Sequence, residues 1–383
     1  MPAAFSLPLV SSSFAALRGR GQEVHIGEAR PGGLSTLKPA LLFFALAGLA
    51  GCDHSVPFST SNSGSSEPFQ AGSPRRLTYN VGQDRSPAWL PDELGLIYSY
   101  ERTDRPDHDR CLGLLPPNGG QRTQEICELA ADADDSTNVL TEPAVDATGR
   151  LAYVATSSGI AATAPIYASL RVSSLTDPGT TRVLVNLPLF TTVLQPRWLG
   201  RDTLVYLAAR VGYSSVCRGC PVDTLETGVA IELLDASAPT PQPQMLAGTA
   251  NASSVAAGAA GFIYYTLNGD TRVFRYAIAS GSAVLAFDFG AAGIARDVQV
   301  TGSRLVAIVG GNVSFVYDST LGYEVQRDGG GALHVVDLTS RTDMILAIPG
   351  LSFRRPALSP SGTRLVVEAR AGGASDLWEV TLP

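Results

Sequence analysis

The sequence predicts an all-β fold, namely a six-bladed propeller of four-stranded antiparallel blades that is closed by the N-terminal strand. Three observations predict it. A short, almost wholly apolar segment recurs six times at an average spacing of about fifty residues, the range of propeller blades. A turn rich in Pro, Gly and small polar residues precedes the clear copies. The two ends of the repeated region resemble complementary parts of one blade.

The recurring apolar segments are expected to form the buried strand of each blade. They are apolar at nearly every position, which is typical of strands that are covered on both faces. In a propeller the neighbouring blades provide that cover. The segments are residues 96–100, 151–155, 204–207, 262–265, 305–309 and 365–367.

A shorter strand and a tight turn are expected before each buried strand. Pro presets the second position of such a turn and Gly supplies a positive φ. The clear turns are residues 146–149, 301–303 and 359–362. Pro near the start of a strand removes no needed ladder bond, and the strands that carry it are residues 86–89, 142–145, 195–198 and 355–358. The fourth and fifth copies lack this Pro and depend on spacing and the buried segment.

Two outer strands are expected to complete each blade, and the chain ends are expected to close the ring. The outer strands are clear in the second copy, at residues 166–172 and 181–187, and in the fourth, at 273–278 and 283–287. The chain ends on a third strand at residues 376–383, whereas the domain begins with a fourth strand at 75–79. The N-terminal strand therefore completes the last blade, which hides the edges of an open sheet.

Several of these stretches resemble the WD-like repeats of the TolB-type six-bladed propeller. They are Arg75-Arg-Leu-Thr78, residues 84–98 and residues 355–365, and the resemblance covers about residues 74–383. The sequence departs from the family at Leu90 and at Glu93-Leu94, where the family favours Ser and a single Gly. The separate N-terminal α/β domain of TolB is also absent. The resemblance implies that the mouth of the central channel engages protein partners.

Residues 1–51 are predicted to be a leader with a lipoprotein signal peptide. After Lys38 comes an apolar run of about eleven residues, too short for a hydrocarbon core that needs roughly twenty. The sequence Leu49-Ala50-Gly51-Cys52 resembles the bacterial lipobox, which implies diacylglycerol on the Cys52 thiol. The predicted location is the bacterial cell envelope, on the periplasmic side or at the outer membrane, with a membrane as partner through this lipid. The alternative is a buried helix with an ordinary Cys.

Residues 52–73 are rich in Ser, Gly and Pro and are predicted to be a flexible tether, with the propeller at residues 74–383. Four cysteines follow Cys52, an even number that favours two disulfides in an exported domain. Cys111 and Cys127 lie symmetrically about Gly119, so a hairpin centred there places them opposite each other. Cys217 and Cys220 form a CxxC without a surrounding βαβ pattern, which favours a small structural disulfide.

The long loops are predicted to lie on one face of the propeller, the top face, where each blade's first strand begins. They are residues 102–110, 129–138, 211–228 and 310–331. Because loops on rigid scaffolds carry function, this face is the predicted binding face; tolerated insertions are the alternative. Its candidate binding residues are those expected just before the first strands, around the channel mouth, and two loop tyrosines: Asp84, Glu142, Gln195, Asp297, Arg355, Tyr213 and Tyr317.

Two of the long loops are acidic. Oxygen ligands in such number are compatible with Ca²⁺, although the spacing is not that of an EF-hand. A solvated acidic surface is the interpretation that charge runs favour, so we predict no metal and no other cofactor. The residues concerned are Asp104, Asp107, Asp109, Asp132, Asp134 and Asp135.

The sequence favours binding over catalysis. The net charge of -7 argues against nucleic acid as a partner. No G-x-S-x-G elbow and no metal-binding His cluster occur in the sequence, which contains only 4 His residues. We therefore predict a cell-envelope lipoprotein whose propeller binds an envelope protein as a scaffold or accessory component and is not an enzyme. The alternative is a propeller that binds glycans or acts on polysaccharide.

Overall fold

The structure is a computed structural model, and its described residues all belong to the compact unit His54–Pro383. They are residues 74–80, 82–102, 109–128, 136–159, 166–214, 223–259, 261–311, 313–318, 323–328, 331–346, 351–371 and 374–382. This part of the chain is β-structure apart from the 3-10 turn η1 (Gly290–Ala292). It includes no helix with the length and apolar character needed to cross a membrane.

The strands follow one another as short antiparallel neighbours along the chain. Their bounds are β1 (Arg75–Arg76), β2 (Asp84–Trp89), β3 (Leu96–Glu101), β4 (Asp109–Leu115), β5 (Gln124–Ile126), β6 (Ser136–Val145), β7 (Arg150–Gly159), β8 (Ile166–Ser174), β9 (Arg182–Asn186), β10 (Thr191–Leu199), β11 (Thr203–Ser214), β12 (Asp223–Asp235), β13 (Gln244–Met245), β14 (Ala252–Ala257), β15 (Phe262–Leu267), β16 (Arg272–Ala277), β17 (Ser282–Asp288), β18 (Ile294–Thr301), β19 (Arg304–Gly310), β20 (Val313–Asp318), β21 (Tyr323–Asp328), β22 (Ala332–Asp337), β23 (Thr342–Leu346), β24 (Ser352–Leu358), β25 (Arg364–Ala371) and β26 (Ala374–Thr381).

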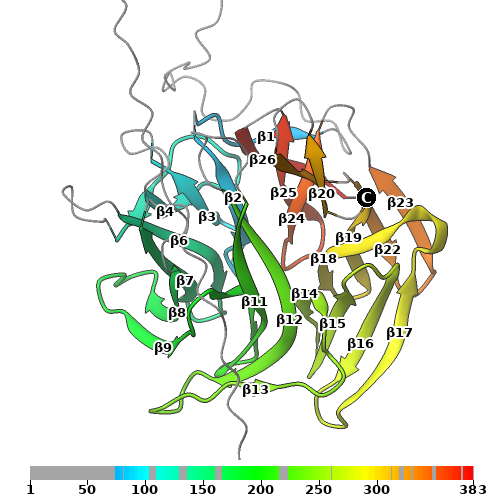
Figure 1. The fold of residues 1–383 in the computed structure, drawn as a ribbon, viewed down its shortest axis with the longest axis horizontal. Coiled ribbons are helices and arrows are strands. Elements are labelled where there is room, and N and C mark those ends of the chain that lie inside the picture. Colours follow the sequence, from blue (N-terminus) through cyan, green and yellow to red (C-terminus); the bar gives the residue numbers. More distant parts are fainter. Residues whose placement is uncertain are drawn as a thin grey trace, which may run out of the picture. The chain divides into compact units, whose positions relative to one another are not determined.

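Most strands belong to four-stranded antiparallel sheets in a propeller-like arrangement (Figure 1). Four separate sheets have the orders β10-β11-β12-β13, β14-β15-β16-β17, β18-β19-β22-β23 and β1-β26-β25-β24. An eight-stranded sheet contains β2 to β9. Its two halves are joined where β4 and β6 pair in parallel, at Asp109 with Asn138 and Arg110 with Val139.

The strands that begin these groups, here called the first strands, are β2, β6, β10, β14, β18 and β24. Each contacts the next along the chain, and β24 contacts β2, so that they surround a common centre (Figure 1). The buried apolar residues lie between neighbouring groups of strands. One such cluster contains Ile97 from β3 and Tyr153 from β7, and another contains Tyr206 from β11 and Val154 from β7. The core is therefore divided among the interfaces between neighbouring groups.

The predicted buried segments are confirmed as strands β3, β7, β11, β15, β19 and β25, each lying second in its group. Tyr98, Tyr153 and Tyr206 from these strands are among the largest fully buried side chains. The predicted outer strands are confirmed as β8 and β9 in one group and as β16 and β17 in another. The pairing of the two chain ends is confirmed as well. Arg75 of β1 lies opposite Glu379 of β26, and the Leu77 amide donates to the Leu377 carbonyl at 2.7 Å.

Two expected loops are different in the structure. Residues 211–228 were predicted to be a long loop, but β11 and β12 extend into them and pair as far as Ser214 with Asp223. Residues 310–331 were predicted to be a long loop, but they contain the hairpin of β20 and β21, with Phe315 opposite Gln326. The physical reason is the β-propensity of the stretch around Phe315, which is rich in aromatic and β-branched residues.

A repeated tryptophan contact joins neighbouring groups of strands. The indole nitrogen of Trp89 donates to the Ala357 carbonyl at 3.0 Å, and that of Trp198 donates to the Ala144 carbonyl at 3.1 Å. An arginine guanidinium from the preceding group covers each ring at 4.5 Å, namely that of Arg364 over Trp89 and that of Arg150 over Trp198. Trp89 and Trp198 therefore make the same contact between neighbouring groups, each through its indole N–H and an arginine over its ring.

The disulfide predicted between Cys111 and Cys127 is confirmed, at a sequence separation of 16. Cys111 belongs to β4, and Cys127 directly follows β5, the strand that pairs with β4. The predicted pair Cys217 and Cys220, the lipobox with Cys52, and the tether all lie outside the described residues.

Candidate functional site

The candidate site is a polar belt formed where the first strands bulge. Ser86, Glu142, Gln195, Asp297 and Arg355 all have positive φ, between 42° and 52°. The pairing of each first strand with the next strand shifts register at this point. A bulge leaves an extra residue outside the ladder and redirects its side chain. Positive φ is uncommon in residues other than Gly and costs conformational energy, so these positions are held by their surroundings.

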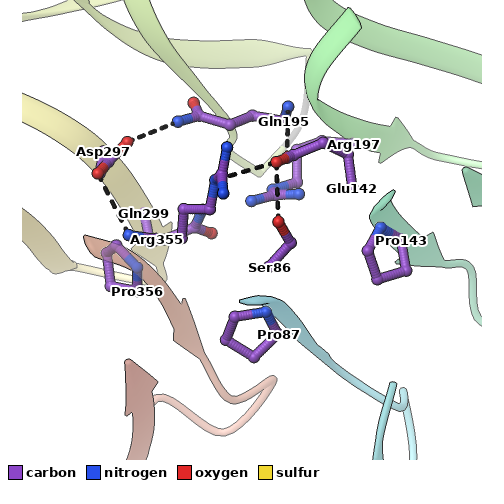
Figure 2. Close-up of a pocket in the computed structure, with 10 residues that line it drawn as sticks. All are labelled: Ser86, Pro87, Glu142, Pro143, Gln195, Arg197, Asp297, Gln299, Arg355 and Pro356. Carbon is purple, nitrogen blue, oxygen red and sulfur yellow. Dashed lines mark hydrogen bonds and ion pairs between the residues drawn. The ribbon is translucent and has the colours of Figure 1, made fainter. Parts of the chain in front are cut away.

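Glu142 is the centre of the belt (Figure 2). Its Oε1 accepts the Ser86 hydroxyl at 2.9 Å and the Nε of Arg355 at 3.0 Å. Its Oε2 accepts the backbone N–H of Gln195 at 2.9 Å. The Glu142 residue is only 4% exposed, so its carboxylate depends on these donors rather than on water.

The same pattern continues around the axis. The side-chain oxygen of Gln195 accepts the Val255 N–H at 2.8 Å, and its Nε2 donates to Asp297 Oδ1 at 3.0 Å. Asp297 Oδ2 accepts the Arg355 N–H at 3.2 Å. A bulge removes an N–H from its ladder, and buried N–H groups need acceptors. The side chain at one bulge therefore satisfies the backbone at or next to the bulge of a neighbouring first strand.

In β14 a hydroxyl has the same role. The Ser254 hydroxyl oxygen accepts the Val298 N–H at 3.2 Å and lies 2.6 Å from the Thr266 hydroxyl. The register of β14 also shifts, between Ala252 and Ser254. Val298, whose N–H is satisfied here, directly follows Asp297 in the bulge of β18.

Two arginines balance the carboxylates of the belt. Arg355 contacts Glu142 and also the fully buried Glu368, whose Oε2 lies 3.5 Å from the guanidinium. Burial lowers the pKa of Arg197, whereas the charges of Glu142 and Asp297 act in the opposite direction. The space left between the belt side chains would hold about one water molecule. Around this space the belt side chains form hydrogen bonds and ion pairs with one another.

The structure brings together Glu142, Gln195, Asp297 and Arg355, which the sequence predicted from their equivalent places in the repeat. Their predicted position just before the first strands was wrong. They lie within β6, β10, β18 and β24, because the bulge is inside each strand. The equivalent residue of β2 is Ser86 rather than Asp84. The sequence signal is the Pro that follows both Ser86 and Glu142, since aligning the repeats on this Pro places Ser86 in the belt position.

Asp84 has a different environment, at the junction between the chain ends. It is the first residue of β2 and is fully buried, and both its oxygens accept from the side-chain amide of Asn80, at 2.7 and 2.9 Å. Burial raises the pKa of Asp84 to about 7, although the hydrogen bonds from Thr78 and Asn80 act to lower it. Sequence reasoning did not find Arg197 or Gln299, which line the belt beside Arg355.

The remaining candidates do not join the belt in the described structure. Tyr213 and Tyr317 were expected in loops, but they lie in β11 and β20, opposite Thr224 and Glu324. Asp109 begins β4 and is buried, and its Oδ1 accepts the Asn138 N–H at 2.9 Å. The other acidic candidates, Asp104, Asp107, Asp132, Asp134 and Asp135, lie outside the described residues. Among described residues, no group of His, Cys, Asp or Glu is arranged to hold a metal ion.

No protein-family model and no curated protein matches the sequence. Solved structures with a similar chain path include a gluconolactonase from Xanthomonas campestris, at 15% identity and TM-score 0.49, over 81% of this chain and 89% of that one. TolB from Acinetobacter baumannii is similar at 13% identity and TM-score 0.46, over 79% and 64% of the chains. An oligogalacturonate lyase from Vibrio parahaemolyticus is similar at 9% identity and TM-score 0.44, over 83% and 96%.

Proposed function

We propose that this chain is a bacterial cell-envelope lipoprotein, anchored through lipid on Cys52, whose propeller binds a protein partner and catalyses no reaction. The observation that supports binding over catalysis is that the carboxylates of the polar belt already accept hydrogen bonds from groups within the protein. An active site aims polar groups at the place of a substrate. Here the carboxylate oxygens of Glu142 and Asp297 accept from protein groups instead.

A count of six blades is part of this proposal. The eight-stranded sheet is divisible into β2 to β5 and β6 to β9, because its halves share only the two parallel residue pairs between β4 and β6. Buried residues of the two halves, such as Leu112 and Leu151, also pack in one cluster, as residues of neighbouring blades do. Together with the four separate sheets, these halves make six. A crystal structure in which the two halves form one flat sheet would contradict this count.

The experiment that tests the function is affinity capture from membranes. The full-length chain with a C-terminal tag is expressed in a bacterium, crosslinked in intact cells and captured after detergent extraction. We expect one envelope protein to be recovered in near-stoichiometric amount, and less of it with Cys52→Ser, because membrane attachment raises the local concentration of the two proteins. Failure to recover a protein with the tether intact contradicts the proposal.

The rival function has its own readout. Binding of the same protein to a glycan array, lost on Tyr213→Ala or Tyr317→Ala, would favour a glycan-binding propeller.

A further inference from the structure

We propose that a cavity where the two halves of the eight-stranded sheet meet binds a neutral sugar, as a monosaccharide or as one unit of a glycan. The cavity has a volume of about 160 Å³, whereas a single water molecule needs about 10–15 Å³. It is separate from the polar belt, and the inference does not depend on the proposed protein partner. The side chains that carry the argument are Glu128, Ala155, Tyr167, Ser169, Arg171 and Asn186.

The strand register places small residues in the middle of the cavity wall. Residues that lie opposite each other on neighbouring strands share one face of a sheet. Ala155 of β7 lies opposite both Leu140 of β6 and Ser169 of β8. Ser169 in turn lies opposite Asn186 of β9. The short side chains of Ala155 and Ser169 leave this wall hollow, and the buried Leu140 adds an apolar patch to it.

Two larger side chains of β8 border the hollow. Tyr167 and Arg171 lie two residues to either side of Ser169, so all three project from the same face of the strand. Tyr167 is 56% exposed, so its ring is accessible from solvent. The C–H groups of a sugar ring carry partial positive charge and are attracted to the negative face of an aromatic ring. Tyr167 therefore provides a stacking surface beside the hollow.

Arg171 is held in a fixed orientation at the other border. Its Nη1 donates to both carboxylate oxygens of Glu128, at 2.6 and 2.5 Å, and its Nε donates to the Ser169 hydroxyl oxygen at 2.8 Å. Glu128 directly follows Cys127 of the disulfide, and its Oε1 accepts the Tyr153 hydroxyl at 3.4 Å. The ion pair is thus in place before a ligand binds, which lowers the entropy lost on binding.

The polar groups around the cavity still have hydrogen-bonding capacity. The hydrogen bonds of Arg171 within the described structure use Nη1 and Nε, which leaves Nη2 for a ligand. The Ser169 hydroxyl accepts from Arg171 and keeps its own hydrogen to donate. Asn186 is exposed, and neither its side-chain amide nor the Tyr167 hydroxyl forms a hydrogen bond with another described residue.

Together these groups fit a neutral ligand with several hydroxyl groups. The positive charge of Arg171 is balanced by Glu128, so the cavity has no net charge to attract a charged ligand. Each hydroxyl group of a sugar both donates and accepts, which matches the mixed donors and acceptors of Arg171, Ser169 and Asn186. The apolar face of the sugar ring would contact Tyr167. A cavity that is apolar in part and has a few convergent polar groups is typical of small-molecule sites.

The test is sugar binding by the purified full-length chain in a detergent without a sugar head group. The probes are the methyl glycosides of glucose, galactose, mannose and N-acetylglucosamine, with that of glucuronic acid as a charged comparison, and affinities are measured by NMR titration. Tyr167→Ala removes the stacking surface, and Asn186→Leu removes hydrogen-bonding atoms at similar side-chain size. Tyr79→Ala is the matched control, since Tyr79 is also exposed, at 42%, but does not line the cavity. An unchanged melting temperature confirms the fold of each variant.

We expect at least one neutral glycoside to bind. Tyr167→Ala and Asn186→Leu should each weaken its binding about fivefold or more, the loss expected for a stacking contact or a hydrogen bond, and Tyr79→Ala should leave it unchanged. Binding of none of the neutral glycosides, tighter binding of the charged glycoside, or equal affinity in Tyr167→Ala and Tyr79→Ala would overturn the inference. Loss of binding on Tyr213→Ala or Tyr317→Ala instead of Tyr167→Ala would also overturn it, because the sugar would then bind elsewhere.

Discussion

Glu142→Ala is the substitution that most directly tests the polar belt. It removes the acceptor of the Ser86 hydroxyl, the Gln195 amide and the Arg355 guanidinium at once. Removing one partner of a buried ion pair costs about 3–5 kcal/mol, and an unpaired buried amide costs about 1–3 kcal/mol. Arg355 retains Glu368 at 3.5 Å, which offsets part of the first cost. We therefore expect a loss of about 4 kcal/mol in the free energy of unfolding.

The assay is urea unfolding at pH 7, followed by tryptophan fluorescence and compared at constant m-value. Glu142→Gln is the matched control, because it keeps an acceptor for the Gln195 amide and should cost about half as much. Arg355→Met in both backgrounds completes a double-mutant cycle, with an expected coupling of at least about 1 kcal/mol. A loss below about 1 kcal/mol for Glu142→Ala, or additive effects in the cycle, would refute a belt held together by this carboxylate.

Three further predictions concern the disulfide, the buried Asp84 and the lipid anchor. Replacing Cys111 and Cys127 by Ser should lower the unfolding free energy by about 3 kcal/mol, the loop-closure value for a separation of 16. Reducing the disulfide of the wild type should lower its unfolding free energy by the same amount. An unchanged unfolding free energy in the variant would contradict a stabilising disulfide. The pKa of Asp84 is raised by burial to about 7, so the native state holds a proton that the unfolded chain releases near pH 4. Wild-type melting temperature should therefore fall between about pH 4 and pH 7, and Asp84→Asn should remove this fall; an equal slope in the variant would exclude Asp84 as its source. Cys52→Ser should leave the chain in the aqueous phase of a detergent partition while the wild type enters the detergent phase, and identical partitioning would remove the lipid anchor.

The polar belt also explains why a first strand tolerates strain in the middle of the fold. In β10 and β24 the N–H of the bulge residue is satisfied by a side chain of another first strand, as Glu142 does for Gln195 and Asp297 does for Arg355. The cost of positive φ at these residues is thus offset by hydrogen bonds that an unbroken strand would not offer. Substitutions in the belt are expected to act through these bonds rather than through loss of a ligand.

The sequence alone determined the features that depend on local pattern. Apolar segments such as residues 151–155 predicted the second strands, because burial on both faces removes the polar alternation from the sequence. The symmetric placement of Cys111 and Cys127 about Gly119 predicted their disulfide, because a hairpin's register is set within the hairpin itself. The pairing of β1 with β26 followed from an unfinished blade at each end.

The tertiary structure alone decided which residues meet. Glu142 and Arg355 come from first strands far apart in the chain, and only the arrangement of β2, β6 and β24 around one centre places their side chains 3.0 Å apart. The belt residue of β2 is Ser86 rather than Asp84, because Ser86 has the positive φ at the register shift, whereas Asp84 still pairs with Tyr100 before that shift. The proposed sugar cavity likewise depends on the register of β6 to β9, contacts between separate strands that local sequence pattern does not encode.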